Sequence, residues 1–156
     1  MGNDKPTYDL ETIRHSAAHL MAQAVKQLYP ETQVTIGPVI EDGFYYDFYR
    51  ESPFVPQDLE KIEQRMKEIS AKNVEIIRQE LSREKALKIF DEMGEPFKLE
   101  VINGIESDDT ISVYSQGEFT DLCRGPHVNN TNIIKSFKLL HTSSAYWRGD
   151  ERNRVL

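Results

Sequence analysis

A chain of 156 residues is long enough to bury a hydrophobic core as one domain, without disulfides or a structural metal. Apolar residues make up 38% of it, as in globular proteins, and none of their runs approaches the ~20 residues of a membrane span. The net charge of −7 argues against a surface that binds nucleic acid along its whole extent, and the single cysteine excludes an internal disulfide. A cytoplasmic globular protein with no contact to membranes is therefore expected.

Hydrophobic periodicity and turn residues predict two helices and a hairpin in the first half of the chain. A helix is expected over 9–29, because apolar residues recur at helical spacing up to Pro30. Asp42-Gly43 separates two β-rich runs and indicates a β-hairpin. A second helix is expected over 56–72, with a proline in its first turn. The hairpin thus lies between two amphipathic helices.

The second half of the chain consists mainly of predicted strands. Ser82 caps a short helix that ends at Gly94. β-rich runs predict strands at 73–81, 97–102, 111–115, 119–123 and 136–147. Because strands and helices do not alternate regularly, the expected fold class is α+β. A largely antiparallel β-sheet would pack against the long N-terminal helix and the further helices.

The first predicted helix carries two histidines on one face. His15 and His19 are four residues apart, one helical turn along the axis. They lie almost opposite an apolar stripe formed by Ile13, Ala17, Leu20, Met21, Ala24, Val25 and Leu28. Ala18 and Ala22 beside them would let another element approach closely. The pair is either solvated or part of a chemical site, and a zinc protease is a poor match because Ser16 replaces its general-base Glu.

The only cysteine lies in a second polar segment, "DLCRGPHVNN". Cys123 and His127 are also four residues apart, but the Arg-Gly-Pro between them favours a loop. Taken alone, one cysteine is more often a small buried hydrophobe than a reactive group. Together with the histidine pair it completes a ligand set for zinc, or a cluster of groups for acid–base hydrolysis. A shared site requires this loop to pack against the first helix.

The pattern "HSAAH … IGPVIEDGFYYDF … CRGPHV … AYWRGD" closely resembles the editing domains of threonyl-tRNA synthetases. The match extends from about Glu11 to the end of the chain. Editing domains of alanyl-tRNA synthetases share both pairs, but they usually have Gly-Gly-Thr between the Cys and the His. The "RGP" of this chain therefore favours the threonyl branch. The resemblance implies a domain that hydrolyses serine wrongly esterified to threonine tRNA and leaves threonine in place.

The resemblance also implies a division of the chain. Residues 1–8 would be a disordered or vector-derived start, 9–148 the editing domain, and 149–156 the start of a linker. In the family this linker leads to a class II catalytic domain, so the chain is expected to be an excised module, with a freestanding editing protein as the alternative. Its expected partners are the rest of a threonyl-tRNA synthetase and the acceptor end of threonine tRNA carrying serine.

Carried over motif by motif, the resemblance assigns a catalytic pocket to six side chains: His15, His19, Lys98, Asp121, Cys123 and His127. Tyr46, together with Lys98 and Asp121, would bind the substrate. His15 or His19 would position or deprotonate the water that attacks the ester. Lys98 would stabilise the oxyanion, and Asp121 would hold the ammonium group of the substrate or orient a histidine.

Three of these assignments have simpler structural alternatives. Lys98 alternates with Phe97 and Leu99 and could be the solvent-facing position of a strand. Asp121 could cap a turn, and Tyr46 could be ordinary packing. Without the resemblance, the simpler interpretation would be preferred for all three.

No cofactor is expected to be required, although the alanyl branch of the family binds zinc. If zinc is bound, its expected ligands are His15, His19, Cys123 and His127. Water, rather than the Cys123 thiolate, is the expected nucleophile. Two other functions stay open: a zinc-dependent alanyl-type editing domain and a non-catalytic tRNA-binding module. Basic side chains near the C-terminus are candidates for phosphate contacts on the acceptor arm: Lys135, Lys138, Arg148 and Arg152.

Overall fold

The computed structural model describes residues 7–105, 110–143, 145, 147–149, 152 and 154–156. Their elements in chain order are α1 (Leu10–Leu28), β1 (Gln33–Val34), β2 (Val39–Ile40), β3 (Gly43–Phe44), β4 (Phe48–Tyr49), α2 (Pro56–Ala71), β5 (Ile76–Leu81), α3 (Arg83–Glu92), α4 (Pro96–Asn103), β6 (Ile111–Gln116), β7 (Phe119–Leu122) and the short 3-10 helices η1 (Thr131–Ile133) and η2 (Trp147–Gly149). All strand pairs among these residues are antiparallel, which confirms the predicted α+β class. None of the described helices is long and apolar enough to cross a membrane.

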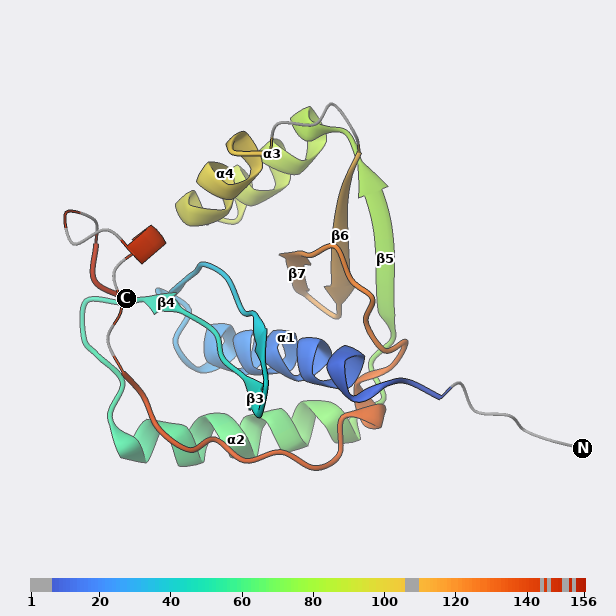
Figure 1. The fold of residues 1–156 in the computed structure, drawn as a ribbon, viewed down its shortest axis with the longest axis vertical. Helices are drawn as coiled ribbons and strands as arrows, with labels where there is room; N and C mark the ends of the chain where they lie inside the picture. The colour runs from blue at the N-terminus through green and yellow to red at the C-terminus, as the bar shows by residue number, and fades with distance from the viewer. Residues whose placement is uncertain (1–6, 106–109, 144, 146, 150–151, 153) are drawn as a thin grey trace, which may run out of the picture.

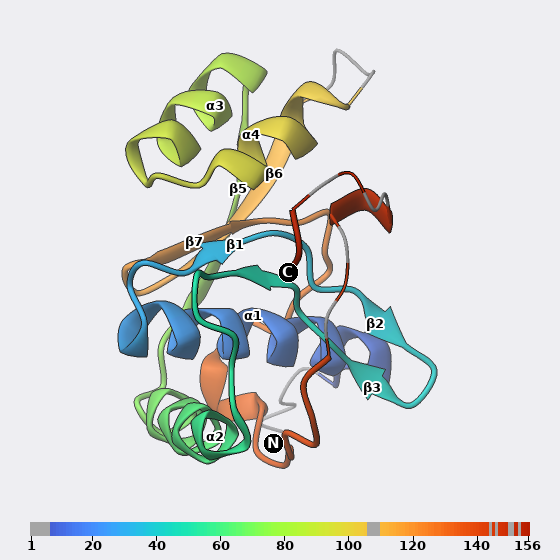
Figure 2. The same cartoon turned by 90° about the vertical axis from the view of Figure 1, so that its left-hand side faces the viewer.

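α1 lies at the centre of the arrangement. Figures 1 and 2 show α2 packed along α1, the sheet β5–β6–β7 beside one end of α1, and the α3–α4 pair at the far end of that sheet. The strands β1–β4 and β2–β3 form two short two-stranded sheets over α1. The predicted hairpin is present, with Ile40 paired to Gly43.

The sequence of α1 explains why two of its faces are buried. Asp9 caps its first turn by accepting a 2.8 Å hydrogen bond from the backbone N–H of Thr12. The apolar stripe packs against α2 and the 128–134 segment in one core cluster. On another face, Ala18 and Ala22 are fully buried against Tyr46 in a second cluster. The small alanines therefore admit a close neighbour, as their position beside the histidines suggested.

The three-stranded sheet holds the start of the Cys-His segment in register. β6 is the central strand, with Tyr114 opposite Arg78 on β5 and opposite Asp121 on β7. A third core cluster, which includes Phe90 and Val113, fills the space between the sheet and the α3–α4 pair. The end of β7 is thus held by its pairing with β6 and by the packing of Leu122 against this third cluster before the loop begins.

Two predicted strands are wrong. Residues 97–102 lie in α4, because Pro96 starts a helix at its first position, where a missing N–H costs nothing. No strand forms among the described residues of 136–147, and the first part of this stretch runs along α2 in Figure 1. There the backbone N–H of Leu139 donates to Glu63 Oε1 at 2.9 Å, so a side chain takes the place of a partner strand.

Candidate active site

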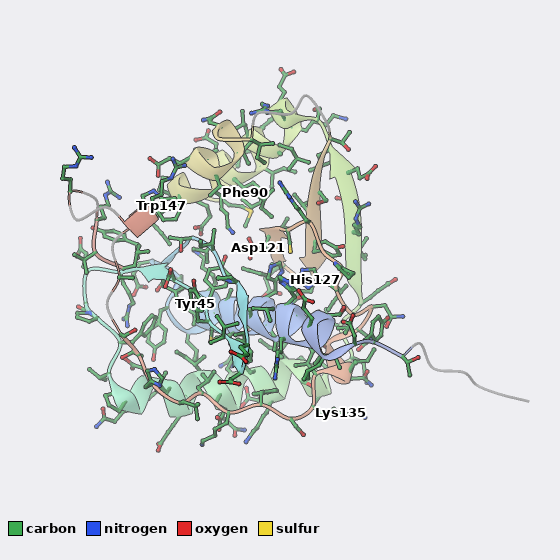
Figure 3. All side chains as sticks on the ribbon, in the orientation of Figure 1. Tyr45, Phe90, Asp121, His127, Lys135 and Trp147 are labelled. Carbon is green, nitrogen blue, oxygen red and sulfur yellow. The ribbon has the colours of Figure 1, made fainter. Side chains whose placement is uncertain are left out.

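The seven side chains proposed for catalysis and substrate binding come together from separate parts of the chain. α1 contributes His15 and His19, and the β3–β4 connection contributes Tyr46. α4 contributes Lys98, and β7 with the loop after it contributes Asp121, Cys123 and His127. In Figure 3, Asp121 and His127 lie between α1 and the three-stranded sheet. The Cys-His loop packs against α1, as a shared site requires.

Asp121 is the centre of the group and is completely buried. Its Oδ1 lies 2.6 Å from Lys98 Nζ and 2.7 Å from the backbone N of Leu122. Its Oδ2 lies 2.9 Å from the Tyr46 hydroxyl and 3.4 Å from His19 Nε2. A carboxylate can accept about four hydrogen bonds, so the bonds from Lys98, Tyr46 and the Leu122 N–H take most of the acceptor capacity of Asp121, and His19 stands beside the remainder. Burial opposes its charge, but Lys98, His19 and the hydrogen bonds together hold its pKa below the usual range.

Tyr46 is held on two sides. It donates its hydroxyl proton to Asp121, and burial followed by the charge of Asp121 raises its pKa well above the ordinary value, so it stays a phenol. Its ring covers Gly37, where an added Cβ would lie 2.3 Å from a ring carbon. Phe48 stacks on the ring at 4.8 Å. The glycine of "IGPV" is therefore needed to admit this tyrosine.

Lys98 is buried on α4, with 2% of its surface exposed, so it is not the solvent-facing residue of the simpler alternative. Its Nζ also lies 5.5 Å from the centre of the Tyr46 ring. The ion pair with Asp121 engages one of the three N–H donors of the ammonium group. The structure thus places a buried cation beside the histidine group.

Two of the three neighbouring histidine rings are buried and neutral. The pKa of His19 is lowered to about 4, because burial outweighs the nearby carboxylate of Asp121. The pKa of His127 is lowered to about 2 by burial and then by the charges of His19 and His15. The His127 ring lies 4.3 Å from that of His19 and 6.0 Å from that of His15, which is the more exposed of the three.

His127 uses its two ring nitrogens differently. Nδ1 lies 3.0 Å from Ser16 Oγ, whereas Nε2 is buried and has no hydrogen-bond partner in the described part of the chain. The edge of the ring also meets Tyr114, with 4.3 Å between the ring centres. A buried polar atom without a partner is rare in folded proteins and marks a place where a ligand or water is accepted.

Cys123 is a poor nucleophile in this setting. Burial, partly offset by a 3.3 Å hydrogen bond from the Gly125 N–H, raises the pKa of its thiol. Gly125 has a φ of +78°, and an added Cβ there would meet the Tyr114 hydroxyl at 2.0 Å. The loop "CRGPH" therefore needs glycine both for its backbone and for space, and the following peptide bond to Pro126 is cis.

Three of the four expected zinc ligands lie together. One donor atom each of His19, Cys123 and His127 falls within 4.8 Å of the others, and His15 is not part of this group among the described residues. Two nitrogens and one sulfur suit zinc, which in hydrolytic sites takes three protein ligands and one open position. The residues present therefore fit a zinc ion, provided that the thiol loses its proton.

Three of the four basic side chains proposed for tRNA have neighbours on two different helices, α2 and α4. Lys138 pairs with Glu63 on α2 at 3.4 Å, and Lys135 lines a shallow groove of about 320 Å³ at the end of the same helix. Arg148 donates instead to the carbonyl of Glu100 on α4 at 3.2 Å. Arg152 is exposed in the C-terminal segment.

Sequence reasoning missed the residues that support the site. Ser16 contacts His127, and Gly37 makes room for Tyr46. Trp147 anchors the C-terminal segment to α4 by donating from Nε1 to Glu100 at 2.7 Å, and it lies beside that helix in Figure 3. The sequence does show Ser16 as a small polar residue between the two histidines, and Gly37 as a glycine ahead of an aromatic run. It does not show which residue either of them contacts.

A family model described as "Threonyl and Alanyl tRNA synthetase second additional domain" matches residues 111–156, which include β6, β7 and the Cys-His loop. Threonine–tRNA ligases of Pelobacter propionicus and Nitrosomonas eutropha are 58% and 57% identical over 98% of this chain and 24% of their own length. That of Methylococcus capsulatus is 56% identical over 94% of this chain and 23% of its own length. The chain thus spans about a quarter of these relatives, and it belongs to the threonyl and alanyl tRNA synthetase second additional domain family.

Proposed function

We propose that this chain is an editing domain, which hydrolyses seryl-tRNA(Thr), spares threonyl-tRNA(Thr), and works within a longer threonyl-tRNA synthetase in the cytoplasm. The named relatives support the enzyme context. One observation carries the hydrolytic role: the buried Nε2 of His127 has no partner in the described residues. The His127 ring lies next to the His19 ring, with 4.3 Å between their centres. His19 in turn lies 3.4 Å from Asp121, which pairs with Lys98.

Proofreading of this kind is needed because the synthetic site of the enzyme binds serine and threonine with similar affinity. Serine and threonine differ by one methyl group, which a synthetic pocket distinguishes by only about 1–3 kcal/mol. A hydrolytic pocket that admits serine and clashes with the extra methyl needs a rigid wall. Tyr46, fixed between Gly37 and Asp121, is the residue that we propose for this wall.

The histidines divide the handling of water between them. A general base works best when its pKa is near the working pH, and the pKa values of His19 and His127 are far below it. His127 Nε2 would therefore orient the attacking water as a hydrogen-bond acceptor. His15, the most exposed of the three, would take the proton.

Lys98 and Asp121 have different tasks in this mechanism. The free N–H donors of Lys98 would stabilise the oxyanion that forms on the ester carbonyl. Asp121 already accepts hydrogen bonds from three groups and lies 3.4 Å from His19 Nε2, so the geometry favours the orienting role over binding of the substrate ammonium. The protonated thiol of Cys123 would line the pocket, and water would attack the ester directly.

Zinc is the main alternative, because His19, Cys123 and His127 could hold it. When bound, a zinc ion would supply a Lewis acid and an activated water at its open position. We propose that no metal is required, since Lys98 already provides positive charge and the Cys123 thiol is protonated near neutral pH. An alanyl-type, zinc-dependent domain would instead lose its activity with a chelator.

The test is deacylation of seryl-tRNA(Thr) and threonyl-tRNA(Thr) by the chain, with and without chelator. Selective loss of serine that survives chelation is expected. His15→Ala should lower kcat by about 10²–10⁴-fold, the usual contribution of an acid–base residue. His141→Ala, at an exposed position, is the matched control.

Other outcomes separate the alternatives. Activity lost on chelation would move the site to the zinc-dependent branch, and cleavage of both tRNAs would contradict the serine selectivity. Full activity of His15→Ala would remove His15 from its proposed role. A chain that binds the tRNA without cleaving either ester, even joined to the rest of the synthetase, would be a binding module.

A further inference from the structure

Ser16 is the residue of α1 that connects the helix to the Cys-His loop. It is completely buried. Its Oγ lies 2.9 Å from the carbonyl oxygen of Thr12, 3.0 Å from His127 Nδ1 and 3.0 Å from the backbone N of Val128. A hydroxyl donates one hydrogen bond and accepts two, so these three contacts match its full capacity.

The three contacts restrict where the protons lie. The Val128 N–H can only donate to Oγ, so the hydroxyl proton goes either to Thr12 O or to His127 Nδ1. In the first case Nδ1 must carry the ring proton and donate it to Oγ. All three contacts are then hydrogen bonds.

The second arrangement is less favourable. It gives up the bond to Thr12 O, which is worth about 0.5–1.5 kcal/mol. It also puts the ring proton of a neutral His127 on Nε2, which is buried and has no acceptor in the described part of the chain. Buried N–H groups without an acceptor are rarer than unfilled acceptors, which a water can occupy. The geometry therefore selects the Nδ1–H form.

We infer that Ser16 is a positioning residue, which holds His127 in the Nδ1–H tautomer and leaves Nε2 as an acceptor for the attacking water. The role of the water rests on the proposed function. The tautomer does not, because it follows from hydrogen bonds inside the folded chain. The serine between the two histidines of "RHSAAH" is thus tied to the histidine of "CRGPH", 111 residues further along the chain.

The experiment compares wild type, Ser16→Ala, Ser16→Thr and Ser70→Ala, each labelled with ¹⁵N-histidine and kept in chelator. Long-range ¹H–¹⁵N spectra report which ring nitrogen of His127 carries the proton. Ser70→Ala is the matched control, because Ser70 is also buried and donates to a backbone carbonyl, that of Ile134, at 2.8 Å. Deacylation of seryl-tRNA(Thr) is measured in parallel.

The expected result is Nδ1–H in the wild type and in Ser70→Ala, with a shift towards Nε2–H in Ser16→Ala. Loss of such a supporting hydrogen bond typically costs about 10–100-fold in activity, so kcat should fall by that factor with KM little changed. Ser16→Thr keeps the hydroxyl and should restore the wild-type tautomer. A merely structural role would lower stability without moving the proton between the nitrogens.

Two results would overturn the inference: Nε2–H in the wild type, or an unchanged tautomer in Ser16→Ala. The wild-type spectrum decides the first point even if Ser16→Ala does not fold. Failure of the proposed function looks different, because the tautomer would shift as expected while no variant deacylates the tRNA. An active wild type with Nε2–H would contradict the inference and leave the function standing.

Discussion

Asp121 organises the site because its four neighbours depend on one buried charge. Asp121→Asn would leave the Lys98 ammonium without its counter-charge at 2.6 Å and replace one acceptor oxygen by a donor. Breaking a buried ion pair by removing one partner costs about 3–5 kcal/mol. We expect a loss of that size in the free energy of unfolding, measured by urea titration.

The control for this substitution is Asp91→Asn, at an exposed position on α3. It should change stability by no more than about 0.5 kcal/mol. Equal effects of the two variants would show that the Lys98–Asp121 pair contributes no more than a surface charge.

Gly37 sets the position of Tyr46. Gly37→Ala would place a methyl group 2.3 Å from the Tyr46 ring and push it away from Asp121. Overpacking of this kind costs about 1–3 kcal/mol. Discrimination between seryl-tRNA(Thr) and threonyl-tRNA(Thr) should also weaken, which the ratio of the two kcat/KM values measures. Gly43→Ala is the matched control, since its Cβ would meet nothing within 4 Å.

At the level of elements, α4 depends on the C-terminal segment for its position. Trp147 packs edge-on against Phe97 with 5.0 Å between ring centres, and its Nε1 donates to Glu100. Both partners flank Lys98 along the helix. Trp147 of the motif "YWRGD" thus holds the helix that carries the site lysine.

Trp147→Ala should loosen α4 and displace Lys98. Removing a buried aromatic side chain costs about 3–5 kcal/mol, and here the loss should appear first as faster amide hydrogen exchange in α4. Trp147→Phe keeps a ring against Phe97 and loses only the bond to Glu100, about 1 kcal/mol. Leu140→Ala, which is 77% exposed, is the control. Unchanged exchange in α4 for Trp147→Ala would contradict the anchoring role.

Local signals predicted the elements that carry their own caps and periodicity. α2 with Pro56 and α3 with Ser82 begin where these residues indicated, and α1 begins at Leu10, one residue inside the range that its apolar spacing predicted. The stretch 97–102 shows how such signals fail, because its alternating apolar residues indicated a strand, whereas Pro96 starts a helix there. The stretch 136–147 fails for another reason: Glu63, distant in sequence, accepts the N–H that a neighbouring strand would have taken.

For the whole molecule, the sequence indicated the chemical groups of the site better than their contacts. The spacing of the two His and Cys-His pairs suggested a common site, but nothing local showed that Ser16 would meet His127. The buried Lys98 on α4 meets Asp121 of β7 and the ring of Tyr46, which come from other parts of the chain. Such contacts join distant parts of the chain, so periodicity and spacing do not contain them.

Burial of two neutral histidines should make the whole fold sensitive to acid. The pKa values of His19 and His127, about 4 and about 2, lie below the 6.5 of an exposed histidine. As pH falls below about 6.5, the unfolded chain binds protons that the folded chain does not, so stability declines with falling pH. The lowered pKa of Asp121 acts in the same direction, and its contribution is lost only at more acidic pH.

The size of this effect follows from proton linkage. Two protons bound only by the unfolded chain give a slope of about 2.7 kcal/mol per pH unit in the free energy of unfolding. Urea titrations in chelator, between about pH 6 and pH 5, measure it without competition from a metal. His19→Gln should remove about half of the slope, whereas His141→Gln, at an exposed position, should leave it unchanged. A slope near zero in the wild type would mean that both rings are charged or solvated in the folded chain, because only burial in the neutral form produces the difference in bound protons.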